Sequence, residues 1–165
     1  MSLANEARGL LRGLTEARIE FFVVGGAAAL MLGAPIVTFD LDIVHRRTPE
    51  NVERLLAWLL SHGAYHRLDL ANRKLPPTRE PLLGSGHVNL QLDIGKLDVL
   101  CELMPGDGYE ELLPSTVVLE LGELRVRVLR LEKIIEMKSR AGRAKDKAVL
   151  PVLLATLDEQ RKAGR

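Results

Sequence analysis

The stretch from Phe21 to Ile43, FFVVGGAAALMLGAPIVTFDLDI, constrains the fold of this chain more than any other. It opens on an apolar run that ends at two glycines, Gly25 and Gly26. This pattern is typical of a buried strand that ends in a turn with unusual backbone angles. The Ala/Leu/Met composition that follows predicts a short helix over 27–32, which Gly33 would end.

The second half of the stretch, 38–43, alternates polar and apolar side chains and predicts a strand. Phe39 would lie on its apolar face with Leu41, whereas Asp40 and Asp42 would share the opposite face. Two carboxylates fixed on one face repel each other, and a bound divalent cation relieves that repulsion. Mg²⁺ suits such a pair, because it is held by one or two carboxylates together with the phosphates of a substrate. A solvated polar face is the alternative interpretation.

The glycine pair supplies a complementary feature. Backbone N–H groups in a glycine turn before a helix approach phosphate oxygens closely, and the helix N-terminus adds partial positive charge. Alone, a glycine pair is more often a plain tight turn. Here 13 residues (positions 27 to 39) separate Gly26 from Asp40. The two features together favour a site for a metal ion and a phosphate-bearing ligand.

A third carboxylate is expected on a later hairpin, whose strands we predict over 88–93 and 96–104. Asp98 is an isolated charge in the apolar second strand, and such a group is costly to bury unless it is paired or coordinated. We therefore expect Asp98 to complete the site, either as a metal ligand or as the base that activates a hydroxyl. Asp93, beside the turn, is the alternative.

The last third of the chain is basic. The helix expected from Leu131 is apolar on one face, yet Lys138 falls on that face. Either its stem is buried with the ammonium in water, or it reaches a triphosphate. Between 125 and 147 nine basic residues stand against three acidic ones, a patch that suits polyphosphate or a nucleic-acid strand. We expect Lys138, Arg143 and Lys145 to lie nearest the substrate.

These features together resemble the nucleotidyltransferase superfamily. Its signature is Gly-Gly or Gly-Ser, a spacer of this size, and then Asp-x-Asp or Asp-x-Glu, as at 25–26 and 40–42. Residues 96–100 resemble the family's third-carboxylate strand, and 138–146 resemble its basic C-terminal segment. The likeness is strongest to small bacterial proteins related to the AbiEii toxin group and to minimal nucleotidyltransferases.

The resemblance implies an α+β fold, with a mixed β-sheet and helices packed mainly on one face. Residues 1–165 would form a single domain, with 131–165 as its C-terminal helical segment. The implied activity is Mg²⁺-dependent transfer of a nucleoside monophosphate from a nucleoside triphosphate to a hydroxyl of RNA, protein or a small molecule, with Mn²⁺ as the alternative ion. The implied metal-binding and catalytic residues are Asp40, Asp42 and Asp98, and the implied nucleotide-binding residues are Gly25, Gly26, Thr38, Lys138, Arg143 and Lys145.

Two non-catalytic interpretations stay open. The chain could be a toxin–antitoxin component that binds a cognate partner protein, or an inactive relative of this fold that senses a nucleotide. The net charge of +1 gives no global field that would favour nucleic acid or a membrane. With one cysteine, no leader pattern and no apolar run near the ~20 residues of a membrane span, we expect a cytoplasmic protein.

Overall fold

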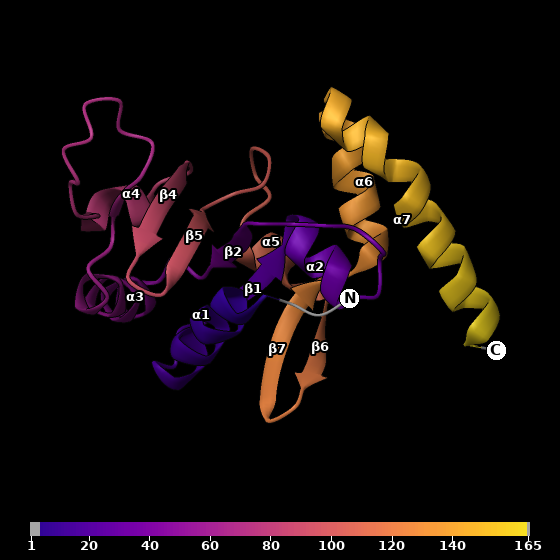
Figure 1. Cartoon of the computed structure of the whole chain (residues 1–165), viewed down its shortest axis with the longest axis horizontal. Coiled ribbons are helices and arrows are strands. Elements are labelled where there is room, and N and C mark those ends of the chain that lie inside the picture. Colours follow the sequence, from indigo (N-terminus) through magenta and orange to yellow (C-terminus); the bar gives the residue numbers. More distant parts are fainter. Residues whose placement is uncertain (1–3, 165) are drawn as a thin grey trace.

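The computed structural model describes residues 4–164 and shows one mixed sheet flanked by helices (Figure 1). In chain order the elements are α1 Asn5–Glu16, β1 Phe21–Val24, α2 Gly25–Met31, β2 Leu41–His45, α3 Pro49–Ser61, β3 Tyr65–His66, α4 Arg79–Leu83, β4 His87–Leu92, β5 Gly95–Leu100, α5 Tyr109–Leu112, a 3₁₀ turn Leu113–Ser115, β6 Thr116–Leu121, β7 Leu124–Leu129, α6 Leu131–Ala141 and α7 Ala144–Ala163.

The seven strands lie in the order β3-β4-β5-β2-β1-β7-β6. Strand β1 is antiparallel to β2 but parallel to β7, and β2 is parallel to β5. The remaining pairs are antiparallel, and one of them, β4–β5, is the expected hairpin, although β5 ends at Leu100 and not at 104. The expected α+β class with a mixed sheet is therefore confirmed.

Helices α1 and α3 cover one face of the sheet. A Cβ on Gly95 of β5 would lie 3.1 Å from the Glu6 carboxylate of α1, which places α1 on the face that Gly95 presents. Trp58 of α3 lies against Gly13 of α1, so the two helices are neighbours. Val99, which alternates with Asp98 along β5, lies on this face and is fully buried.

The opposite face is more polar and carries fewer helices. Phe22 and Tyr109 stack on part of it, with ring centroids 5.2 Å apart. Elsewhere it presents Asp42, Asp98 and Asn89 at adjacent positions of three neighbouring strands. Helix packing mainly on one face leaves this polar surface available to a ligand.

Local sequence signals account for several boundaries. Helix α3 begins after Thr48, whose Oγ1 accepts a hydrogen bond from Asn51 N at 3.3 Å. Helix α2 begins at Gly25 itself, two residues before the expected start. Helix α7 runs past Pro151 as one helix, and it packs against α6 at the far end of the molecule (Figure 1).

The predicted strand over 38–43 is wrong at its beginning, because β2 starts only at Leu41. Phe39 is 87% exposed and does not join the apolar face with Leu41. Asp40 precedes the strand and is exposed. The Thr38 hydroxyl donates to the Asp40 carbonyl at 3.3 Å, and such local bonds compete with a strand ladder.

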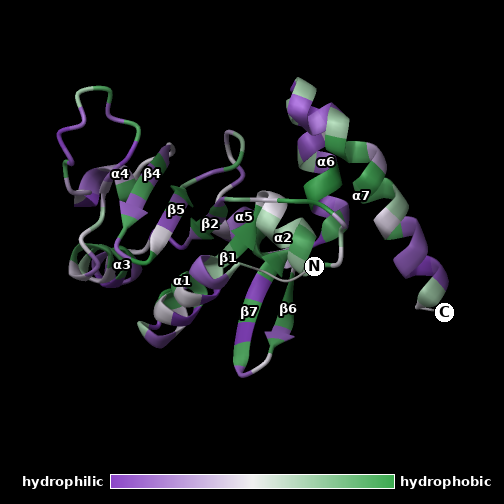
Figure 2. Cartoon of the chain, in the orientation of Figure 1, coloured by the Kyte–Doolittle hydropathy of each residue, from purple (hydrophilic) through white to green (hydrophobic). Residues whose placement is uncertain are grey.

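The other differences are smaller. The segment over 71–87, whose Pro, Gly, Arg and Lys content predicts a loop, contains the short helix α4. The two-residue strand β3 was not predicted, and the expected start of the first helix at Leu3 lies outside the described residues. Figure 2 shows the hydrophobic β1 in green and the C-terminal half of α7 largely in purple. Among residues 4–164, no helix has the length and apolar character needed to cross a membrane.

Candidate active site

Asp42 and Asp98 form the centre of the site. They lie directly opposite each other on the parallel strands β2 and β5, with Leu41 opposite Leu97 one residue before them. Neighbouring strands are about 4.8 Å apart, and paired positions point to the same face. Asp98 is 8% exposed and Asp42 is half-buried, so the two carboxyl groups share a partly dehydrated surface.

The two carboxyl groups ionise differently. Burial raises the pKa of Asp42, and its hydrogen bond to Asp98 and the charges of Asp98 and Asp40 raise it further, to about 7. Burial also opposes ionisation of Asp98, but hydrogen bonds from Arg67 and Asn89 outweigh it and hold the pKa of Asp98 below its ordinary value. In the metal-free site Asp98 therefore carries the charge, while Asp42 holds a proton up to neutral pH.

Two donors fix one oxygen of Asp98. Arg67 Nη1 donates to Oδ1 of Asp98 at 2.5 Å and also to the Leu90 carbonyl at 3.1 Å. Asn89 Nδ2 donates to the same Oδ1 at 2.9 Å. Because both donors use Oδ1, the second carboxylate oxygen is left for Asp42 or a cation.

Sequence reasoning missed both donors. Asn89 could have been found from the sequence, because a hairpin whose turn lies at residues 93–94 pairs Asn89 with Asp98. Arg67 gave no comparable signal, since it follows the very short strand β3. It joins the site through its backbone N–H, which donates to the Asn89 carbonyl at 3.1 Å.

The glycine turn lies against Asp42. Gly25 has φ +66°, and a Cβ added there would lie 2.9 Å from Asp42 Oδ2. A Cβ on Gly26 would lie 3.1 Å from the Thr38 hydroxyl. The structure thus brings together four of the predicted site residues, Gly25, Gly26, Thr38 and Asp42, where the first turn of α2 meets the start of β2 (Figure 1).

The expected cluster of three carboxylates is not assembled. Among residues 4–164, no group of three or more His, Cys, Asp or Glu side chains is arranged to hold a metal ion. Asp40 is close enough to raise the pKa of Asp42, but it is exposed and precedes β2. The donors that are paired, Asp42 and Asp98, are hard oxygen ligands. They fit Mg²⁺, which needs only one or two carboxylates when water and phosphate complete its shell.

The predicted basic residues make a separate contact. Lys138 Nζ lies 3.4 Å and Arg143 Nε 2.7 Å from the carboxylate of Asp146, which is fully buried. The hydrogen bond from Arg143 is the largest effect that lowers the pKa of Asp146. These bonds tie α6 to the first turn of α7, so the hydrogen bonds of Lys138 and Arg143 go to Asp146 rather than to the carboxylate pair. Lys145 is exposed.

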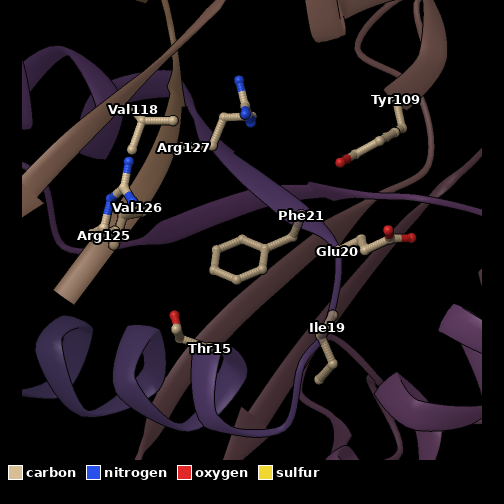
Figure 3. A pocket seen from close by; sticks show the side chains of 9 residues that line it. All are labelled: Thr15, Ile19, Glu20, Phe21, Tyr109, Val118, Arg125, Val126 and Arg127. Atoms are coloured by element: carbon tan, nitrogen blue, oxygen red, sulfur yellow. The ribbon is translucent and has the colours of Figure 1, made fainter.

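The alternative carboxylate, Asp93, is elsewhere. It is an exposed residue of the β4–β5 turn, and it pairs with His62 at 2.9 Å. Figure 3 shows the side chains that line another hollow, among them Glu20, Arg125 and Arg127. Its volume is about 360 Å³, and it includes Phe21, which begins β1, whereas Gly25 follows the end of that strand. We place the candidate site at the carboxylate pair and not in this hollow, because Glu20 is the one acidic residue among the described residues that line the hollow.

This chain is similar to known proteins in its structure but not detectably in its sequence. No protein-family model matches the chain, and no curated protein matches its sequence. The lincosamide antibiotic adenylyltransferase LnuA, solved with lincomycin bound, superimposes with a TM-score of 0.64 at 12% identity, over 93% of this chain and 98% of that one.

Two further solved structures are similar. A putative nucleotidyltransferase from Thermotoga maritima gives a TM-score of 0.57 at 17% identity, over 90% of each chain. An antigenic nucleotidyltransferase-like protein from Paracoccidioides brasiliensis gives 0.59 at 18% identity, over 91% of this chain and 72% of that one. The chain therefore has the nucleotidyltransferase fold, as its motifs implied.

Proposed function

We propose that the protein is a nucleotidyltransferase that moves a nucleoside monophosphate from a nucleoside triphosphate to a hydroxyl acceptor in the presence of a divalent cation. The observation that carries this proposal is the register of Asp42 with Asp98 beside the glycine turn. It combines paired oxygen ligands with backbone N–H groups at one corner of a sheet that has the nucleotidyltransferase fold.

Asp42 and Asp98 would hold Mg²⁺, or Mn²⁺ in its place, and Asp40 is the remaining carboxylate of the predicted set. The bound ion would neutralise charge on the attacking and leaving oxygens of the α-phosphate. Gly25 and Gly26 would bind the phosphates through backbone N–H groups, with Thr38 beside them. Lys138, Arg143 and Lys145 would lie nearest the outer end of the polyphosphate.

The test is a nucleotide-transfer assay with α-labelled triphosphates on Asp40→Asn and Asp42→Asn. We expect either change to abolish Mg²⁺-dependent transfer while circular dichroism shows an intact fold. Asp93→Asn is the matched control, because it removes an exposed carboxylate outside the site and should leave transfer unchanged. Retained transfer in Asp42→Asn would falsify the assignment.

A second function, nucleotide sensing without transfer, is favoured by one observation. Arg67 already pairs with Asp98 and so occupies one oxygen of that carboxylate. A sensor would show a thermal shift with Mg²⁺ and triphosphate but no labelled product. A toxin–antitoxin component that works only by binding its partner would show neither.

A further inference from the structure

A second hollow, of about 290 Å³, lies toward the β3 edge of the sheet, beyond the carboxylate pair as seen from the glycine turn. It lies between strand β4 and the segment that leads out of β3, which we call the 67–75 loop. One of its walls is Asn89, the residue that donates to Asp98. The lining residues are His66, Leu68, Asp69, Arg73, Leu75, His87 and Asn89.

The order of strands across the sheet shows where this hollow lies relative to the carboxylate pair and the glycine turn. From β1 to β3 the neighbours are β1, β2, β5, β4 and β3. Gly25 follows β1, Asp42 and Asp98 lie on β2 and β5, and the hollow lies over β4 and β3. The proposed phosphate site and the hollow therefore lie on opposite flanks of the carboxylate pair.

The 67–75 loop is held in place by its own hydrogen bonds. The loop closes at its base, where His66 N donates to the Leu75 carbonyl at 2.9 Å. Inside it, the Asp69 carboxylate accepts bonds from the Arg73 backbone N–H and from Arg73 Nε, both at 3.0 Å. A loop cross-linked in this way presents a preformed wall to a ligand.

The lining selects a class of ligand. The charges of Asp69 and Arg73 neutralise each other in an ion pair, so the hollow offers no net charge to attract a nucleic-acid backbone. His66, His87 and Asn89 add imidazole and amide groups that donate or accept hydrogen bonds, while Leu68 and Leu75 add apolar surface. The volume is near the lower end of ~300–1,000 Å³ for small-molecule sites.

We infer that this hollow binds the acceptor, and that the acceptor is a small neutral molecule that carries several hydroxyl groups. The inference rests on the proposed function. One acceptor hydroxyl would bond to the α-phosphorus of the triphosphate as the bond from that phosphorus to the bridging oxygen breaks. Pyrophosphate leaves, and the hydroxyl proton passes to solvent.

The experiment uses the full chain with Mg²⁺ and α-labelled ATP, and it offers two fractions of a cell extract as acceptors. One is the small-molecule filtrate after ionic solutes have been removed on a mixed-bed resin, and the other is the macromolecular retentate. Leu68→Arg places a bulky charge in the lining, where Leu68 is 67% exposed. Leu70→Arg is the matched control, because Leu70 is a fully exposed residue of the same loop outside the lining.

We expect label to enter the neutral filtrate, and Leu68→Arg to reduce that transfer at least about tenfold, which corresponds to ~1.4 kcal/mol. Leu70→Arg should retain it, and both variants should keep the thermal shift with Mg²⁺ and ATP. Label that enters only the retentate, or equal losses in the two variants, would overturn the inference. Failure of the proposed function would give a different result. In that case no fraction would support the release of pyrophosphate, and Asp42→Asn would not change the thermal shift with Mg²⁺ and ATP.

Discussion

Asp42 lies in register with Asp98 on the neighbouring parallel strand, and the proton that the pair shares resides on Asp42, whose pKa is raised to about 7. A cation that binds the pair must displace this proton. The cation affinity of the site is therefore linked to pH.

The first prediction is that Mg²⁺ or Mn²⁺ binds more tightly as the pH rises toward about 7 and that the gain then levels off. Below that value the affinity should fall up to about tenfold per pH unit, because one proton is released for each ion bound. Calorimetric titration in two buffers of different ionisation enthalpy measures the proton release. Asp42→Asn should bind more weakly and release no proton, and the same proton release from that variant would refute the assignment.

The same residue predicts a trend in stability. The pKa of Asp42 is higher in the folded state than in the unfolded chain, so its contribution is present at low pH and is lost as the pH rises through about 7. Metal-free protein should therefore lose stability as the pH rises from 3.8 to about 7, with no further loss from this group above that value, and added Mg²⁺ should restore it. Asp42→Asn should remove this dependence in denaturant titrations of the metal-free protein.

A second prediction concerns Arg67. Its side chain is 16% exposed and that of Asp98 is 11% exposed, so Arg67→Met leaves a buried carboxylate without its cation. We expect the free energy of unfolding to fall by about 1–3 kcal/mol without metal, with partial recovery in Mg²⁺. Arg73→Met is the control, because the 61% exposed Arg73 pairs in a loop. Its cost should stay under about 1 kcal/mol, and equal losses would contradict the structural role of Arg67.

A third prediction separates backbone strain from contact with the site. Gly25 and Gly63 have almost the same φ, +66° and +63°, but only at Gly25 would a Cβ meet Asp42. Both Ala substitutions should cost about 1–2 kcal/mol of backbone strain. Gly25→Ala should in addition weaken cation and nucleotide binding, as measured by titration. Unchanged binding in Gly25→Ala would mean that the turn is only structural.

A fourth prediction concerns His45, a fully buried residue of β2. Its Nε2 donates to the Leu82 carbonyl at 2.7 Å, while Nδ1 has no partner among the described residues. Burial lowers the pKa of His45 below 6.5, so the unfolded chain takes up a proton that the folded chain does not. Stability should fall as the pH drops below 6.5.

Because the pH trends of Asp42 and His45 oppose each other, the measurement belongs in the Asp42→Asn background. There, denaturant titrations at about pH 7.5 and about pH 5.5 should show a loss that His45→Gln reduces. An equal loss in the two proteins would assign the acid sensitivity to other groups.

Sequence reasoning was most successful where local patterns decide the structure. The glycine turn and the hairpin of β4 and β5 depend on backbone angles or near neighbours, and the sequence predicts both, although β5 ends at Leu100 and not at 104. The alternation of polar and apolar residues gave a wrong prediction for Phe39. Such spacing shows which face of a strand a residue would take, but it does not show where strand pairing begins.

The rest of the site depends on contacts between distant segments. The bond from Arg67 to Asp98 spans 31 positions, and no periodic pattern announces it. The contacts of Lys138 and Arg143 are local by comparison, because Asp146 lies eight and three positions away from them. Their charge was visible in the sequence, but the buried Asp146 that binds them lies across the corner between α6 and α7.

The position of β3 at one edge of the sheet has a practical consequence. The spacing of Asp42 and Asp98 is set by the backbone ladder between inner strands, whereas the 67–75 loop leaves from the outermost one. Exchanging residues 68–75 for another segment of similar span, with Arg67 kept, would replace one wall of the hollow without touching the ladder or the bond from Arg67 to Asp98. If the proposed function holds, this part of the loop is the natural place to graft new acceptor preferences while the carboxylate pair stays unchanged.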